Sequence, residues 1–416
     1  MSEGRNSIKK LGICDINRIR HPGPFCPFRK KDMTLIIQNP NLQPTNPPRR
    51  LLLGPGPQNA HPRVHAAMAL PQVGHMDPSF MRIMEDTKSL LKYAWQTNNR
   101  FTIPVSGTGS AAWEAAVANL TEPGDVHLIC VNGYFGERAL DIHSRYGADV
   151  RKIVKPDGDV FTLDEIRAGI EKHRPSLVWL CHAETSTGTL QPMEGIGKLC
   201  RDYDCLLLLD TVTSICGSPI HVDEWMVDAV YAGGQKCMGC PPGVSCLSLN
   251  DRALRKLEGR KSHVANWYLD MTMIKKYLDV PTGAVRTYHH TAPISMIYAM
   301  RESLQLVSEE GLEKAWERHR MVADLLYIGL SELGLECVVD PAVRNPALTT
   351  VRIPPHLDAG KIITFLREKF EIEIGGGLGT LKDKIIRIGL MGYNARPDNV
   401  LIVLAALKEA VKVCHK

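Results

Sequence analysis

Short apolar runs alternate with longer amphipathic stretches between residues 80 and 250. The apolar runs have the length of strands, and their apolar residues are continuous, as expected for strands that are covered on both faces. Seven segments have this character: residues 101–105, 126–131, 150–154, 177–181, 205–209, 229–232 and 244–249. Helical spacing characterises stretches between them, such as 81–95 and 111–120. This alternation predicts an α/β fold with a mostly parallel seven-stranded sheet covered by helices.

The pattern changes after residue 310, where a long amphipathic stretch at 311–333 predicts a helix. Further helices are predicted at 358–370 and 397–414. Strands are predicted at 335–339, 349–353, 372–374 and 385–390. We therefore expect a large domain over residues 51–310, a smaller α+β domain over 311–416, and a cleft between them as the ligand site.

Residues 1–50 differ from the rest in charge and proline content. Eight lysines and arginines stand against three acids up to residue 33, and nine prolines follow between residues 21 and 57. Proline at this density disfavours helices and central strands, which predicts a basic, extended N-terminal arm. The whole chain has a net charge of +5, so the remainder is balanced. A balanced body argues against nucleic-acid binding.

Composition places the chain among globular proteins, with 44% hydrophobic and 23% charged residues. Its longest apolar run, residues 400–407, is too short to span a bilayer. We expect a soluble intracellular protein of the cytoplasm or an organelle matrix, the mitochondrion included. The final Val413-Cys414-His415-Lys416 differs from an SKL-type peroxisomal signal.

Twelve cysteines raise the question of disulfides or metal. Several lie inside apolar runs, where cysteine behaves as a small hydrophobic residue. Cys237 and Cys240 form one CxxC pair without a second pair, which is a weak metal or redox signal. We expect reduced thiols and no metal.

Four polar features follow predicted strands, where open α/β sheets bind their ligands. Ser106-Gly107-Thr108-Gly109-Ser110 precedes a helix, so it could bind a phosphate or be a tight turn with a serine N-cap. Asp210 follows a buried strand and needs a cationic or hydrogen-bonding partner, such as a protonated ring nitrogen, unless it caps the next helix. Lys236 follows two glycines, where burial would favour the neutral amine, although a solvated lysine is the common case.

Arg387 is flanked by apolar residues on both sides. Such an arginine requires an anionic partner, either a substrate carboxylate or an internal acid. A phosphate site, a carboxylate for a pyridinium nitrogen, an amine for an aldehyde and an arginine for a carboxylate together indicate pyridoxal 5'-phosphate acting on an amino acid.

From about residue 51 onward the chain resembles the alanine–glyoxylate and serine–pyruvate aminotransferases, class V of the fold-type-I pyridoxal-phosphate enzymes. The resemblance rests on eight ordered motifs: Leu53-Gly54-Pro55-Gly56-Pro57, Val105-Ser106-Gly107-Thr108-Gly109, Asn132-Gly133-Tyr134-Phe135-Gly136, Glu184-Thr185-Ser186-Thr187-Gly188, Asp210-Thr211-Val212-Thr213-Ser214, Gln235-Lys236, Tyr288-His289-His290-Thr291 and Arg387-Ile388-Gly389-Leu390-Met391-Gly392.

The resemblance implies a role for each residue that contacts the cofactor ring. Lys236 would form the Schiff base with the aldehyde and move the proton, and Asp210 would keep the ring nitrogen protonated. Val212 would pack on the ring, and Thr185 would contact its hydroxyl. Phe135 stands where the animal enzymes often have the stacking tryptophan, so stacking remains but an indole N–H is absent.

The resemblance also implies how phosphate and substrate are bound. The phosphate would be held by Thr108, Gly109, Ser110 and Gln235. Tyr288 and Thr291 of a neighbouring subunit would complete that site, which implies a homodimer with shared active sites. Arg387 and the backbone of Gly56 would bind the substrate carboxylate.

These roles predict a transaminase that moves an amino group from alanine or serine to glyoxylate, giving glycine and pyruvate or hydroxypyruvate. Residues 74–80 differ from some relatives where the substrate side chain is read, so the donor stays open. The alternatives are a transaminase for 3-hydroxykynurenine or ureidoglycine, and a lyase or cysteine desulfurase of the same fold. A binding protein without a cofactor is the alternative of another class.

Overall fold

The computed structural model describes residues 37, 39–40, 42–280 and 284–416. Residues Arg49–Lys416 form one compact unit. The predicted arm, residues 1–50, lies mostly outside the described residues, and the predicted boundary at residue 310 stays a prediction. No helix among the described residues has the length and apolar character needed to cross a membrane.

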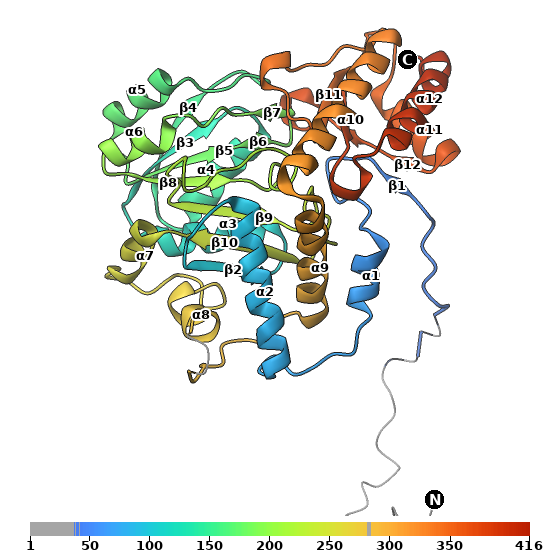
Figure 1. Cartoon of the computed structure of the whole chain (residues 1–416). Helices are drawn as coiled ribbons and strands as arrows, with labels where there is room; N and C mark the ends of the chain where they lie inside the picture. The colour runs from blue at the N-terminus through green and yellow to red at the C-terminus, as the bar shows by residue number, and fades with distance from the viewer. Residues whose placement is uncertain (1–36, 38, 41, 281–283) are drawn as a thin grey trace, which may run out of the picture. The chain divides into compact units, whose positions relative to one another are not determined.

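A seven-stranded sheet forms the centre of the unit (Figure 1). Its order is β2-β10-β9-β8-β5-β3-β4, and all neighbours are parallel except those of β10. The strands are β2 (Phe101–Ser106), β3 (Val126–Val131), β4 (Asp149–Val154), β5 (Leu177–Cys181), β8 (Leu206–Asp210), β9 (Ala229–Gly233) and β10 (Val244–Leu249). All seven predicted strands are confirmed within one residue at each end.

Proline occurs inside β2, where it needs a particular position. Proline has no N–H to donate to a ladder, so it is tolerated on an edge strand. Pro104 pairs with Cys246 of β10, and β2 is the edge strand on that side of the sheet. The sequence Phe101–Ser106 therefore fits the edge rather than the centre.

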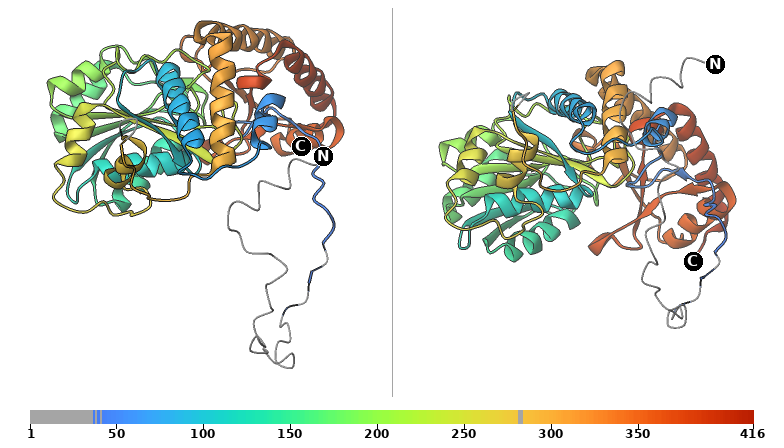
Figure 2. Two further views of the ribbon diagram at one scale, coloured as in Figure 1. Left: turned by 60° about the horizontal axis from the view of Figure 1, so that its bottom comes forward. Right: turned by 90° about the horizontal axis from the view of Figure 1, so that it is seen from below.

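Helices pack around this sheet and beside it. Those that precede or connect its strands are α1 (Pro62–Met68), α2 (Pro78–Trp95), α3 (Gly109–Leu120), α4 (Tyr134–Arg145), α5 (Leu163–His173) and α6 (Ile196–Asp202), and α7 (Asp251–Glu258) and α8 (Met271–Leu278) follow its last strand. The long helix α9 (Ile294–Glu310) runs beside α1 and α2 in the views of Figures 1 and 2. Two short strands, β6 (Ala183–Glu184) and β7 (Thr189–Leu190), form a hairpin after β5.

The C-terminal part has a three-stranded antiparallel sheet of order β11-β14-β13. Its strands are β11 (Leu348–Arg352), β13 (Gly375–Gly376) and β14 (Ile385–Gly389). Three helices accompany it: α10 (Leu312–Glu332), α11 (Ala359–Phe370) and α12 (Pro397–Val413). Strand β12 (Ile372–Glu373) instead pairs in parallel with β1 (Leu51–Leu52), which lies near the beginning of the unit in the sequence.

The predicted strand at residues 335–339 is wrong. Only Cys337 makes a bridge there, to Val351 of β11, and the neighbouring residues contribute isolated backbone bonds. Leu335 and Val339 are still buried. A short, mostly apolar segment can therefore be buried without regular strand pairing, which its pattern alone does not reveal.

Buried apolar residues form two clusters. The larger one surrounds the seven-stranded sheet, and the smaller one lies among α10, α11, α12 and the three-stranded sheet. Helix α10 contributes to both, with Leu312 in the larger cluster and Val322, Leu326 and Leu330 in the smaller.

Candidate active site

A cavity of about 210 Å³ opens where β8 and β9 end and α3 begins. The carboxyl ends of parallel strands meet at one edge of a sheet, which is where open α/β sheets bind their ligands. The lining residues are Gly109, Ser110, Trp113, Phe135, Arg138, Cys181, Thr185, Asp210, Val212, Gln235 and Lys236. Eight residues predicted for the site therefore line one cavity.

Lys236 is buried in this cavity, with 7% of its surface exposed. Its Nζ donates a hydrogen bond to the carbonyl oxygen of Pro55, and a Cβ at Gly56 would come within 2.6–3.0 Å of the lysine's Cδ, Cε and Nζ. Burial, assisted by the positive charge of Arg387, lowers the pKa of Lys236 to about 8. The alternative of a solvated lysine is therefore wrong. The lowered pKa leaves a fraction of the Lys236 amine neutral near neutral pH.

Asp210 ends β8 and is 4% exposed. Its carboxylate accepts hydrogen bonds from the Val212 N–H at 2.8 Å and from the Tyr231 hydroxyl at 2.7 Å. Trp179 Nε1 donates in turn to the Tyr231 oxygen at 3.1 Å. Burial raises the pKa of Asp210 to about 6, although these hydrogen bonds oppose the shift. Residues 211–228, which connect Asp210 to β9 and are all described, contain no helix. The alternative that Asp210 caps a helix is therefore wrong.

The loop before α3 presents backbone amides to the cavity end. Thr108 is the N-cap residue of α3, and no side chain caps that helix. The turn with a serine N-cap is therefore wrong, and the N–H groups of Gly109 and Ser110 stay available to an anion. Ser110 lines the cavity, whereas Thr108 is exposed and lies just outside its wall.

Gln235 adds an unsatisfied polar atom to the same region. Its Oε1 is buried and has no hydrogen-bond partner among the described residues. A Cβ at Gly233 would lie 2.6 Å from that oxygen, so the glycine gives the amide its space. A buried acceptor without a partner costs about 1–3 kcal/mol, which a ligand that donates to it would recover.

Arg387 extends from β14, in the C-terminal part of the fold, and is 5% exposed. Its Nε donates to the Gly376 carbonyl at 2.7 Å and its NH1 to the Thr185 carbonyl at 2.9 Å. Among the described residues no carboxylate lies within ion-pair distance of it, so the internal-acid alternative is wrong. Burial lowers the pKa of Arg387 to about 10, and the nearby Glu184 opposes this.

Tyr288 and Thr291 do not line this cavity. The Tyr288 side chain is 57% exposed, and its hydroxyl lies 3.4 Å from Thr291 Oγ1. The chain itself therefore does not bring these two predicted phosphate ligands to its own site.

Besides Cys181, which lines the cavity at the end of β5, the site contains three further residues that the sequence did not predict. Trp113 lines the cavity from α3, and its ring stacks on Trp179 and Tyr231 at 5.5 and 5.7 Å. Arg138 lines it from α4, with its guanidinium 5.0 Å from the centre of the Phe135 ring. Their positions within helices hid them, since only the helical spacing of 135 and 138 places both on one face.

Glu184 is the third, and it is 1% exposed. Its Oε1 accepts from the backbone N–H and the hydroxyl of Ser186, at 2.9 and 2.6 Å, and from the Phe135 N–H at 3.5 Å. Its Oε2 is buried with no partner among the described residues. Burial raises the pKa of Glu184. The residue thus fixes the beginning of α4 beside the cavity.

The family described as aminotransferase class-V matches residues 60–400 of this chain. The alanine–glyoxylate aminotransferase of Rattus norvegicus is 45% identical over 385 residues, which is 92% of this chain and 93% of the rat protein. The chain belongs to the class-V aminotransferases. Proteins of this family are pyridoxal-phosphate-dependent, and this chain is a transaminase of that kind.

Two further relatives bear on the choice of substrate. The solved structure of alanine–glyoxylate aminotransferase from Nostoc sp. has a TM-score of 0.88 and 50% identity, over 90% of this chain and 100% of that one. The (S)-ureidoglycine–glyoxylate transaminase of Bacillus subtilis (strain 168) is 39% identical, over 88% of this chain and 92% of that protein.

The residues that line the cavity of this transaminase fit pyridoxal phosphate in their chemistry. A buried lysine amine and a buried carboxylate line the same space, with an aromatic and an aliphatic side chain, Phe135 and Val212, on its walls. The uncapped start of α3 offers backbone N–H donors, which are the polar contacts that a phosphate end accepts.

Proposed function

We propose that this enzyme transfers an amino group from alanine or serine to glyoxylate, giving glycine and pyruvate or hydroxypyruvate. The observation that carries the proposal is the cavity shared by Lys236, Asp210 and Thr185, with Arg387 donating to the Thr185 carbonyl. Alanine and glyoxylate are the substrates named by relatives that are 45% and 50% identical over nine-tenths of the chain, and serine is the alternative donor implied by the sequence resemblance.

The cofactor would be bound from four sides. Lys236 would hold its aldehyde end, and Asp210 would face its ring nitrogen. Phe135 and Val212 would contact the two faces of the ring, and Thr185 its hydroxyl. The phosphate would accept hydrogen bonds from the start of α3 and the neighbouring side chains: Thr108, Gly109, Ser110 and Gln235. When bound, pyridoxal phosphate supplies an electron-withdrawing ring that accepts the electron pair left at the substrate Cα.

Two groups would orient the amino acid. The Arg387 guanidinium is held by two backbone carbonyls, which leaves its remaining N–H groups for a carboxylate. The backbone of Gly56 packs against Lys236, so a carboxylate bound there would place Cα close to the lysine amine. Lys236 Nζ would remove the Cα proton, because its lowered pKa of about 8 leaves a useful fraction unprotonated near neutral pH.

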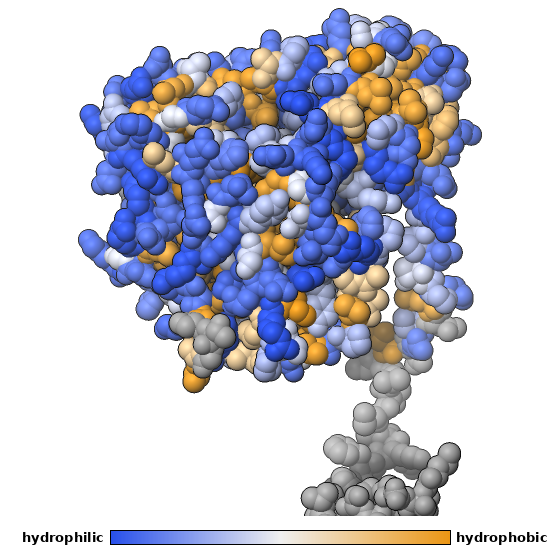
Figure 3. Space-filling model, viewed as in Figure 1, coloured by the Kyte–Doolittle hydropathy of each residue, from blue (hydrophilic) through white to orange (hydrophobic). Residues whose placement is uncertain are grey.

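A homodimer would complete the phosphate site through the partner copy's equivalents of Tyr288 and Thr291. Support comes from the exposed aromatic surface around these residues, where Trp267 is 61% and Tyr268 43% exposed. Trp267 stacks on His289 with a ring separation of 4.6 Å, which joins the two segments into one surface. Figure 3 shows apolar side chains at the lower end of the molecule, near α8. Exposed aromatic clusters are typical of protein interfaces.

A donor–acceptor panel tests the proposal. The purified holoenzyme is incubated with alanine, serine, (S)-ureidoglycine or 3-hydroxykynurenine against glyoxylate or pyruvate, and the 2-oxo acid product is quantified. We expect the highest kcat/KM for alanine or serine with glyoxylate. A higher value for either of the other donors would refute the substrate assignment while leaving the transaminase intact.

Lys236→Ala serves as the negative control and should lose at least about a thousandfold in turnover, because it removes both the covalent anchor and the base. Lys198→Ala is its matched control, since Lys198 is two-thirds exposed and its side chain pairs with Asp202, away from the cavity lining. Retained turnover in Lys236→Ala would contradict the lysine's role.

The ureidoglycine reaction is the second candidate, favoured by the Bacillus subtilis relative. A lyase or desulfurase has weaker support: the cysteine desulfurase of Thermococcus onnurineus is 14% identical with a TM-score of 0.69, a likeness of fold alone.

A further inference from the structure

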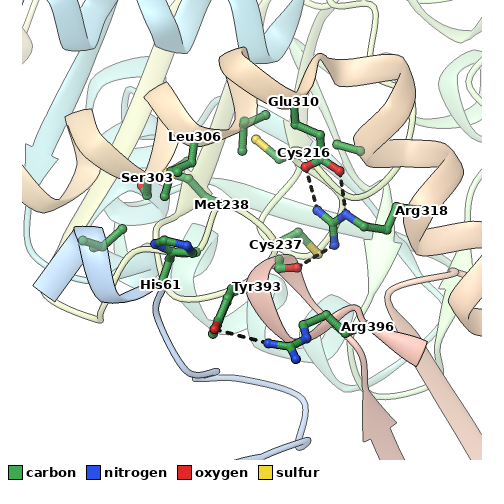
Figure 4. A pocket seen from close by; sticks show the side chains of 15 residues that line it. His61, Cys216, Cys237, Met238, Ser303, Leu306, Glu310, Arg318, Tyr393 and Arg396 are labelled. Carbon is green, nitrogen blue, oxygen red and sulfur yellow. Dashed lines mark hydrogen bonds and ion pairs between the residues drawn. The ribbon is translucent and has the colours of Figure 1, made fainter. Parts of the chain in front are cut away.

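A second cavity, of about 290 Å³, is lined by the three residues that follow Lys236: Cys237, Met238 and Gly239. Its other walls come from α1, α9, α10 and the turn Gly392–Asn394 (Figure 4). It shares no lining residue with the active-site cavity. An occupant would therefore contact the backbone next to the lysine without competing for the cofactor site.

The interior of this cavity is largely apolar. Val64, Met238, Leu306, Val307 and Ala315 contribute aliphatic surface. The thiols of Cys216 and Cys237 also line it, and burial raises the pKa of Cys237 to about 12, so that thiol stays neutral. A cavity of about 150 Å³ with such a lining is enough for a benzene ring, so this one accommodates a ring with a substituent.

The charged residues of the wall are already paired. Glu310 accepts two hydrogen bonds from Arg318, at 2.6 and 2.8 Å, and the Arg318 NH1 donates to the carbonyls of Gly392 and Ala395. Arg396 pairs with Asp398. Figure 4 shows the Glu310–Arg318 pair within the wall. A charged ligand would find no free countercharge here and would lose its hydration, which favours an uncharged ligand.

Two hydrogen-bond donors meet at one end of the cavity. His61 Nδ1 accepts the Arg63 N–H at 3.1 Å, so the neutral ring carries its proton on Nε2. The Tyr393 oxygen accepts from Arg396 NH1 at 3.2 Å, which leaves its own proton to donate. The two rings lie edge to face at 4.9 Å, and Figure 4 shows them side by side. Within the described part of the chain neither proton has an acceptor.

A buried amide adjoins the same wall. Gln58 is 5% exposed, and neither its Oε1 nor its Nε2 has a partner among the described residues. A Cβ at Gly392 would lie 3.0 Å from the Gln58 Nε2 and 3.2 Å from its Oε1, so the amide packs directly against a glycine of the cavity wall. Unmet donors and acceptors at this depth favour a ligand that carries both.

We propose that this cavity is a binding site for a small uncharged ligand with an apolar ring and a carboxamide-type polar end. The ring lies against Met238 and Leu306, and the carbonyl oxygen accepts from His61 and Tyr393. The ligand then contacts the segment that carries Lys236, which makes the cavity a place from which the active site can be modulated.

Benzamide is the probe, with benzoate and benzylamine as charged molecules of the same size. Saturation-transfer NMR on the holoenzyme measures the dissociation constant of each. Leu306→Trp fills the cavity, and Ser308→Trp is its matched control, because Ser308 lies two residues further on the same helix, is exposed and does not line the cavity.

We expect benzamide to bind wild type and Ser308→Trp alike, and Leu306→Trp at least about tenfold more weakly. Benzoate and benzylamine should bind wild type at least about tenfold more weakly than benzamide. Equal benzamide binding by both variants, or no binding to wild type, would overturn the site. Equal binding of a charged probe would overturn the ligand class. Ser303→Leu fills the cavity less and replaces Leu306→Trp if the latter fails to fold, with the same expected loss.

Discussion

Burial shifts the pKa values of two residues at the centre of the active site, Asp210 and Lys236, in opposite directions. Without a cofactor, the pKa of Asp210 is raised from 3.8 to about 6 and that of Lys236 is lowered from 10.5 to about 8. Asp210 therefore opposes folding above about pH 6, and this penalty disappears as the pH falls below about 4. Lys236 opposes folding below about pH 8, and its penalty disappears as the pH rises above about 10.5. Both residues are retained at a cost in stability, as expected of functional groups.

The Asp210 shift predicts how cofactor binding depends on pH. Between about pH 7 and pH 5 the carboxylate becomes mostly protonated, so the affinity of the apoenzyme for pyridoxal phosphate should fall about tenfold through this group. Fluorescence titration at both pH values measures it. Asp210→Asn should bind more weakly at both and lose that tenfold dependence, whereas the same pH slope in the variant would assign it to another group.

At the scale of elements, the beginning of α4 is held by a hairpin far away in the sequence. Glu184 and Ser186 accept from the N–H groups of Phe135 and Tyr134, respectively, the latter bond measuring 2.9 Å. These contacts fix the ring of Phe135 at the cavity wall. Helix N-termini carry unpaired N–H groups, so acceptors there stabilise the helix.

Removing the Glu184 acceptor should therefore loosen cofactor stacking. We expect Glu184→Ala to lower Tm by several degrees, from a loss of about 1–3 kcal/mol, and to weaken the visible circular dichroism of the bound cofactor. Glu184→Gln keeps an acceptor oxygen and should restore most of both. An unchanged cofactor signal in Glu184→Ala would show that the residue acts on stability alone.

Gly133, which precedes α4, packs closely against Glu184 and Ser186, so a larger side chain at this position should also disturb the start of the helix. A Cβ there would lie 2.5 Å from Glu184 Cγ and 2.6 Å from Ser186 Oγ. Gly133→Ala should cost about 1–3 kcal/mol of unfolding free energy, measured by denaturant titration. Gly74→Ala is the matched control, because a Cβ there meets nothing within 4 Å. Equal stability of the two variants would contradict the close packing.

At the scale of the whole molecule, the proposed shared active site can be tested by complementation. Lys236→Ala and a Tyr288→Ala/Thr291→Ala double variant each damage one half of a site that two copies form. A mixed dimer would contain one site with both halves intact. When equal amounts of the two variants associate at random, about half of the dimers are mixed and each has one intact site of two. The sample should therefore recover about a quarter of wild-type activity.

The measurement is turnover of the mixed sample after unfolding and joint refolding, with each variant refolded alone as control. Activity no higher than that of the two controls would place both halves of the site in one chain, or remove the two residues from it.

The local hydrophobic pattern was sufficient to predict the seven-stranded sheet and the polar residues at the ends of its strands. Asp210, Lys236 and the loop before α3 follow buried strands, and parallel strands necessarily bring such residues to one edge. Arg387 could be identified as an arginine in need of an anion, but pattern alone left two partners open. The packing excluded an internal acid among the described residues, because carbonyls rather than a carboxylate hold its guanidinium, and the substrate carboxylate stays a prediction.

The sequence by itself determined the strand–helix order, the seven strands and the chemistry available after them, because hydrophobic period and turn residues act over a few positions. Only the tertiary structure decided that Glu184 accepts a hydrogen bond at the start of α4, that Arg138 lies over Phe135, and that residues 335–339 do not form a strand. Those outcomes depend on which segments meet across tens or hundreds of residues, and a burial pattern records that a side chain is covered without recording what covers it.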